Sequence, residues 1–70
     1  MHITYNSKFD LLYIRFDSRP QQLICERVSE DVTFDIGEGD KIVGIDILDA
    51  SQHLNLDELL PVKSEVLEVA

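Results

Sequence analysis

The sequence has little of what several large classes of protein depend on. It holds one cysteine, so no disulfide can form within one copy, and a reducing compartment is the expected setting. Only six of its 70 residues are Lys or Arg, whereas fourteen are Asp or Glu, which gives a net charge of −8. Phosphate backbones and anionic membrane surfaces repel such a chain, so we expect no nucleic-acid partner and no membrane partner.

Long apolar runs are missing from the sequence too, and none is long enough to span a bilayer. The first residues lack the basic and then apolar pattern of a secretory signal, which predicts a cytoplasmic protein. What the chain does have is a hydrophobic fraction of 44%, which is normal for a globular protein. We expect a single small domain over residues 1–70, with 61–70 as an extended or partner-ordered tail.

A hairpin over residues 32–48 is the clearest structural signal. The apolar residues of each arm alternate with other residues and share one face: Val32, Phe34 and Ile36 in the first arm, and Val43, Ile45 and Ile47 in the second. Because a slip of one residue would turn every side chain over, matching these faces fixes the register. The predicted pairs are Val32–Ile47, Phe34–Ile45 and Ile36–Val43, with Thr33 opposite Asp46 and Asp35 opposite Gly44.

Three further strands are predicted over residues 2–5, 11–16 and 22–28, where apolar residues again alternate or cluster between turn signals. The second of them is apolar on both faces, which predicts a central position in the sheet. Asp49 followed by Gln52 is typical of a helix start, and a helix is expected over residues 49–60, broken near Asn55 and ended by Pro61. Short strands with tight connections favour an α+β fold, an antiparallel meander of four to five strands with a short C-terminal helix.

One short helix covers only part of one face of such a sheet. Leu11, Tyr13, Ile42 and Leu48 are then left on the other face, and an uncovered apolar face is typical of an interface. We therefore predict a homodimer that uses these four residues. The charge is uneven, +1 over residues 1–27 and −9 over residues 28–70, so a basic protein partner is a second possibility.

Asp35, Asp46 and Asp49 are the weak candidates for a metal or catalytic site. The predicted register places Asp35 and Asp46 on one face of adjacent strands, with their Cβ atoms about 7 Å apart or closer. This distance is short enough for the two carboxylates to interact or to bind a hard cation. A solvated face, with Asp49 as a helix cap, explains the same residues, and no dense calcium loop or phosphate-binding motif is present. Cys25 is expected to be a small buried apolar residue. No cofactor is predicted.

Three segments of the chain resemble the bacterial family catalogued as domain of unknown function 2283. These are residues 5–16, with an aromatic residue, a loop and an apolar strand, the arm 32–36 with the Gly/Asp turn after it, and residues 41–51, KIVGIDILDAS. The chain departs from the family pattern at Phe9 and over residues 19–28. The resemblance implies a compact β-rich fold and supplies no catalytic residues.

The function that these observations favour is a non-enzymatic module for protein interaction or homodimerisation. The alternative is a small metal-dependent or hydrolytic enzyme built on the acidic cluster Asp35, Asp46 and Asp49.

Overall fold

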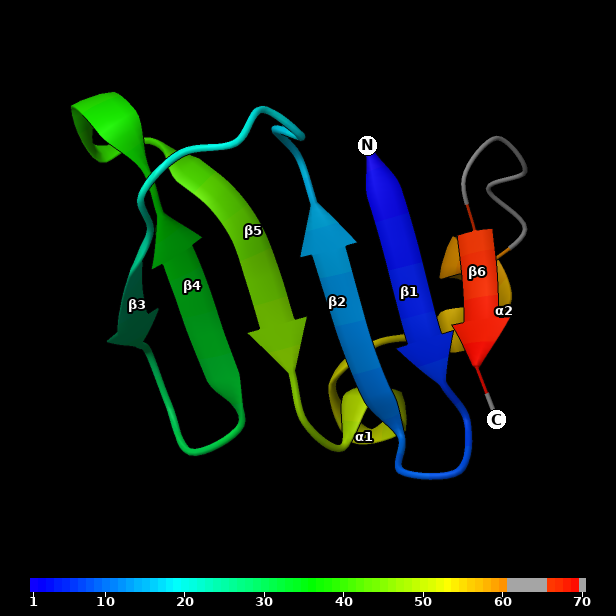
Figure 1. Ribbon diagram of the computed structural model, residues 1–70. Helices are drawn as coiled ribbons and strands as arrows, with labels where there is room; N and C mark the ends of the chain where they lie inside the picture. Colours follow the sequence, from blue (N-terminus) through cyan, green and yellow to red (C-terminus); the bar gives the residue numbers. More distant parts are fainter. Residues whose placement is uncertain (61–65, 70) are drawn as a thin grey trace.

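The computed structural model describes residues 1–60 and 66–69, and places its strands in one sheet with two short helices. The elements are β1 (His2–Asn6), β2 (Leu11–Arg15), β3 (Ile24–Arg27), β4 (Val32–Ile36), the 3-10 turn η1 (Glu38–Asp40), β5 (Ile42–Ile47), α1 (Ala50–His53), α2 (Leu56–Leu59) and β6 (Val66–Val69). Strands β1 to β5 pair antiparallel, which confirms the predicted α+β class (Figure 1).

The predicted meander order is wrong. The strands lie in the order β3-β4-β5-β2-β1-β6, so β2 pairs with β5 and not with β3. The connection from β2 passes across the end of the β4–β5 hairpin and places β3 at the outer edge (Figure 1). With apolar residues on both faces, β2 buries more apolar surface between β5 and β1 than it would at an edge. The central position that its sequence predicts is confirmed.

The hairpin register is confirmed at four of its five predicted pairs. Val32 faces Ile47, Thr33 faces Asp46, Phe34 faces Ile45 and Asp35 faces Gly44. The fifth pair is wrong, because the register shifts after Asp35 and Ile36 faces Ile42. A bulge of this kind inserts one extra residue, here Val43, into one arm of the pair.

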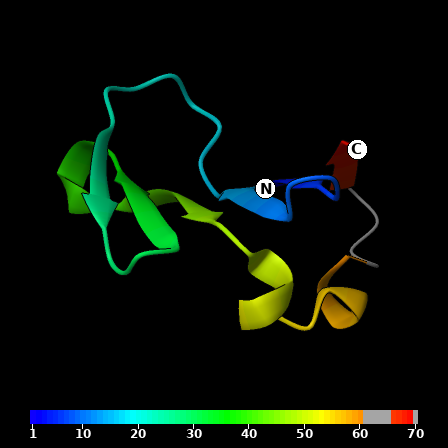
Figure 2. The same cartoon turned by 90° about the horizontal axis from the view of Figure 1, so that it is seen from below.

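Both helices lie on the same side of the sheet (Figure 2), and the main core cluster lies between them and the strands. Its buried residues come from three strands and the first helix: Ile3, Tyr5, Leu12, Ile47 and Ala50. The helices are four residues each and are separated at Leu54 and Asn55, which confirms the predicted break. No helix in the described residues is long and apolar enough to cross a membrane.

The cap of α1 comes from a distant turn and not from Asp49. Asp49 has a left-handed backbone with φ of 51° and makes no side-chain cap bond, so the predicted cap is wrong. Asp10, in the β1–β2 turn, takes its place: its carboxylate accepts bonds from the Ser51 backbone N–H (3.1 Å) and hydroxyl (2.6 Å). The Tyr5 hydroxyl donates to the same carboxylate at 2.8 Å. The turn, the helix and the core are therefore joined at one side chain.

Strand β6 lies beside β1 and parallel to it, with Ile3 opposite Val66. Part of the predicted extended tail is therefore a sheet strand. The remainder of that prediction, over residues 61–65 and 70, lies outside the described residues.

Candidate functional site

A polar cluster lies on the face of the sheet opposite the helices. Side chains alternate along strands, so Tyr13, Asp46 and Asp35 point away from the core that Leu12 and Ile47 enter. The Tyr13 hydroxyl donates to Asp35 Oδ2 at 2.8 Å, across the intervening strand β5. Both bonded residues lie in strands, so their geometry is fixed by the sheet.

Cys25 belongs to this cluster, and the prediction that it is buried is wrong. Its strand β3 is at the edge of the sheet, which leaves the side chain exposed. The thiol donates to Asp35 Oδ1 at 3.3 Å. This bond and the negative charge of Asp35 raise the pKa of Cys25, because both favour the protonated thiol. The site therefore holds a thiol that is poorly suited to act as a nucleophile.

The two acidic side chains of the sheet influence each other. Asp35 and Asp46 lie on adjacent strands, as the register predicts. Partial desolvation and, second, the charge of Asp35 raise the pKa of Asp46. Desolvation and the bond to Asp35 also raise the pKa of Tyr13. The Asp35 carboxylate thus accepts two hydrogen bonds beside a second acid.

The structure does not join Asp49 to these two acids. Asp49 follows the end of β5 at the start of α1, where its left-handed backbone turns the chain toward the helix. Within residues 1–60 and 66–69, no group of three or more His, Cys, Asp or Glu side chains is arranged to hold a metal ion. Whether Asp35, Asp46 and Asp49 act together stays a prediction.

Asp46→Asn is expected to raise the free energy of unfolding slightly at pH 7. A carboxyl whose folded pKa is raised contributes stability while it is protonated, and this contribution is lost as the pH rises through its unfolded and then its folded pKa. Amide substitution removes the charged form, so the gain should be present at pH 7 and absent near pH 3. Urea unfolding at the two pH values, with Asp57→Asn as the control on α2, measures it; equal effects of both substitutions would contradict it.

Gly44 lies under the ring of Tyr13. A Cβ at this glycine would overlap the Tyr13 hydroxyl and would approach the Ile14 carbonyl oxygen to 3.1 Å. The sequence predicted that Gly44 faces Asp35, but not that an aromatic ring crosses above it. The glycine is therefore required for the Tyr13–Asp35 bond to form over β5.

Gly44→Ala is expected to lower the free energy of unfolding by about 1–3 kcal/mol, the usual range for an overpacked site. The measurement is chemical unfolding of Gly44→Ala alone and combined with Tyr13→Ala. Removal of the ring should relieve most of the effect of the alanine. Additive losses in the double variant would show that the ring is not the obstacle.

The four predicted interface residues differ in exposure. Ile42 is 45% exposed and Leu48 is 39% exposed, whereas Leu11 and Tyr13 are half-buried. The Tyr13 hydroxyl is engaged with Asp35. An interface over these residues stays a prediction.

Sequence reasoning missed the open edge at β3. Val28 N–H donates to the Val32 carbonyl at 2.8 Å, which makes this pair a hydrogen-bonded one. Hydrogen-bonded and non-hydrogen-bonded pairs alternate in an antiparallel ladder. The backbone N–H and C=O groups of Glu26 therefore also bond to β4, whereas those of Cys25 and Arg27 point outward from the sheet. No described strand lies beyond β3. The only sequence signal near this edge was that residues 19–28 depart from the pattern of the family that the chain resembles.

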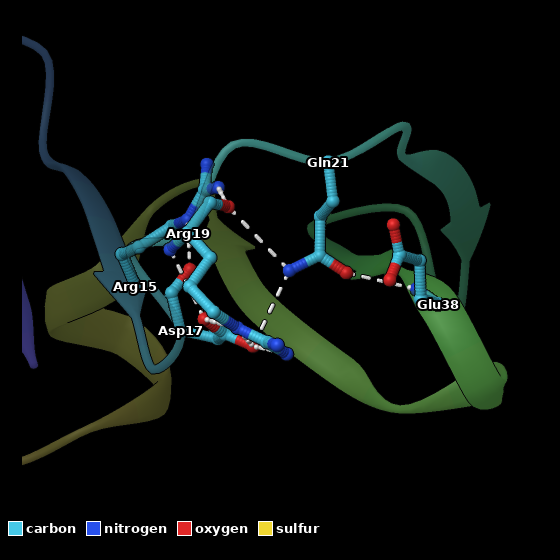
Figure 3. A network of polar contacts seen from close by, with 5 residues as sticks. All are labelled: Arg15, Asp17, Arg19, Gln21 and Glu38. Carbon is cyan, nitrogen blue, oxygen red and sulfur yellow. Dashed lines mark hydrogen bonds and ion pairs between the residues drawn. The ribbon is translucent and has the colours of Figure 1, made fainter.

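A polar network holds the segment that leads to this edge (Figure 3). Arg19 donates to the Asp17 carboxylate through Nη2 at 2.8 Å, and Arg15 donates to the Asp17 carbonyl at 2.7 Å. Gln21 Nε2 donates to Asp17 at 3.3 Å, and Gln21 Oε1 accepts the Glu38 N–H at 2.8 Å. The bonds from Arg19 hold the pKa of Asp17 well below its usual range. The connection before β3 is thereby attached to the β4–β5 turn.

Residues 2–51 match the family described as protein of unknown function (DUF2283), which is more than half of the chain. The chain belongs to this family. The matched DUF2283 region contains strands β1 to β5, and it includes both Asp10 and the Ser51 that Asp10 caps. No curated protein and no solved structure matches the chain.

Proposed function

We propose that the protein is a non-enzymatic protein-interaction module that binds another protein chain, either a second copy or a basic partner. The observation that carries the proposal is the outer edge of β3. Its four residues are all exposed, and Ile24 there is 70% exposed. An edge with outward N–H and C=O groups is a template for pairing with a further strand.

The composition supports the same proposal. A chain of 70 residues has a small core, and small domains gain stability when they associate. The family supplies no activity to set against an interaction role. Cytoplasmic localisation is part of the proposal and is supported by the single cysteine, which is typical of a protein in a reducing compartment.

A hydrolytic or metal-dependent enzyme built on the acidic cluster has less support. Both oxygens of the Asp35 carboxylate accept hydrogen bonds, from Tyr13 and from Cys25. Asp49 contributes to the turn before α1 rather than to the face that holds Asp35. A bound cation would raise the melting temperature by mass action, so melting with excess calcium, magnesium, manganese or zinc tests this alternative.

Cys25→Pro tests the proposed use of the edge. The N–H group of Cys25 points outward, so proline there removes no backbone bond to β4 and is compatible with an edge strand; of the bonds to β4 it removes only the one from the thiol to Asp35. We expect the variant to fold and to lose binding. Cys25→Ser, which keeps the N–H group, is the matched control and should bind as the wild type does.

The measurement has two arms, one for each kind of partner. Light scattering over a dilution series gives the mass of the wild type and of both variants, which reports a second copy. A displayed peptide library, selected on the wild type and counter-selected on Cys25→Pro, reports a different partner. A monomeric mass together with peptides that bind both proteins equally, or no selected peptide, would overturn the proposal.

A further inference from the structure

The two sides of β3 differ in chemistry. Ile24 and Val28, which are 70% and 56% exposed, flank Glu26 on the side of the sheet that carries the helices, because Glu26 faces Phe34. The helices lie under the half of the sheet that contains β1 and β2, so they do not reach this edge (Figure 2). A strand added here would extend the apolar surface at Ile24 and Val28.

The opposite side of the edge carries Cys25 and Arg27, and the Arg27 guanidinium there donates to the Glu30 carbonyl at 3.1 Å. The acidic groups of this side lie at its Cys25 end. Cys25 faces Asp35, and Asp46 lies one strand further in. In the described part of the chain, no Lys, Arg or His side chain forms an ion pair with Asp35 or Asp46. If another strand pairs with β3, its residue opposite Cys25 lies in the same row across the sheet as Cys25 and Asp35. A long basic side chain at this position can extend across Cys25 toward the carboxylate, since adjacent strands are about 4.8 Å apart.

From these observations we infer the chemistry of the occupant, which rests on the interaction role proposed above. The β3 edge binds an extended segment of another protein in which two adjacent basic residues stand between apolar residues. In an antiparallel arrangement the apolar residues face Ile24 and Val28. The first basic residue faces Glu26, and the second faces Cys25 and reaches toward Asp35.

A second copy of the chain fits this edge less well. If two copies paired along their β3 edges, a twofold axis perpendicular to the sheet would relate them and would pair residues of the same face. The backbone groups available for such pairing belong to Cys25 and Arg27. The register that uses the outward groups of both residues within β3 pairs Cys25 of one copy with Arg27 of the other, and it places the two Glu26 side chains opposite each other. Like charges directly opposite are destabilising, and each copy carries a net charge of −8. Charge complementarity therefore favours the basic segment.

The probe is a synthetic peptide, acetyl-Gln-Val-Thr-Lys-Arg-Val-Thr-amide, titrated into the ¹⁵N-labelled protein. Its valines would face Val28 and Ile24, its lysine Glu26, and its arginine Cys25. Two controls keep the charge: a scrambled peptide with the basic residues at the ends, and a peptide methylated at the arginine and first threonine nitrogens. The methyl groups remove the backbone bonds to Cys25 and Arg27.

We expect saturable binding of the probe, with slowed exchange of the Cys25 and Arg27 amides. Loss of the two backbone bonds should weaken binding roughly tenfold. Asp35→Asn and Glu26→Gln should each weaken binding, whereas Asp57→Asn, which makes the same change in charge on α2, should not. Circular dichroism checks that each variant is folded.

Two results would overturn the inference. The first is that the probe does not bind. The second is that the probe binds no more tightly than the methylated or the scrambled peptide, which would show attraction by charge alone. These results remain distinct from failure of the proposed function. If the library yields peptides that depend on the Cys25 N–H group but lack the basic pair, the interaction role stands and only the inferred chemistry is wrong.

Discussion

Leu12→Ala is expected to lower the free energy of unfolding by about 3 kcal/mol, within the usual 2–5 kcal/mol for loss of a buried leucine. Leu12 is 1% exposed and belongs to the core cluster with Ile3, Ile47 and Ala50. The cavity would open in the middle of a central strand, where neighbours on both sides are held by hydrogen bonds. A domain of this size has a small free energy of unfolding, so a large fraction of the variant should be unfolded at physiological temperature.

Leu11→Ala is the matched control for this substitution. Leu11 is the adjacent residue of the same strand and points to the opposite face, where it is half-buried. Urea unfolding followed by circular dichroism should show a loss well under half that of Leu12→Ala. Equal losses would mean that the face opposite the helices is covered in solution, as the predicted homodimer requires.

Asp10→Ala should produce the largest loss of stability among substitutions of polar residues. Asp10 accepts bonds from Tyr5 and Ser51 and has a left-handed backbone with φ of 55°, so alanine removes the bonds and adds strain. We expect a melting temperature several degrees below that of the wild type. Asp40→Ala is the control, because Asp40 has a similar φ of 58° and makes no described side-chain bond. Similar melting of the two variants would attribute the effect to backbone strain alone.

The same carboxylate gives a pH dependence of known sign. Bonds from Ser51 and then Tyr5 lower the pKa of Asp10. A lowered folded pKa means that the stability from Asp10 is present above the unfolded pKa of about 3.9 and is lost as the pH falls through the folded value. The difference in melting temperature between the wild type and Asp10→Asn should therefore narrow below about pH 4. A constant difference down to pH 2 would contradict this assignment.

Alternation along the strands predicted the hairpin pairs, because burial of one face leaves only one register. The bulge escaped prediction, since the alternation of Val43, Ile45 and Ile47 favours Val43 as the partner of Ile36, and no local signal marks the extra residue. The order of the sheet escaped it as well. No residue pattern within β2 indicates that its neighbour is β5. The general preference for short connections between adjacent strands favoured β3 as the neighbour.

The candidate site was also predicted in part, where strand register determines it, and missed where distant segments meet. The register placed Asp35 and Asp46 diagonally on one face of adjacent strands, and the structure has them there. Cys25 was assigned to the interior as a small apolar residue, and its position on an exposed edge strand reverses that assignment. The cap of α1 could not be found by scanning adjacent residues, because Asp10 and Ser51 are 41 positions apart.

The order of the strands has a consequence for the speed and sequence of folding. The β1–β2 and β4–β5 pairs each join neighbours in the chain, so each hairpin can form with a short loop to close. The β2–β5 pair joins Leu12 to Ile47 and requires both hairpins to meet across a long intervening segment. We expect this docking to be the slow step, with substitutions at Ile45 altering the folding rate more than substitutions at Ile24 on the outer strand. The β3–β4 pair also joins neighbours in the chain through a short loop, so the edge that is free to receive another strand can form before this docking.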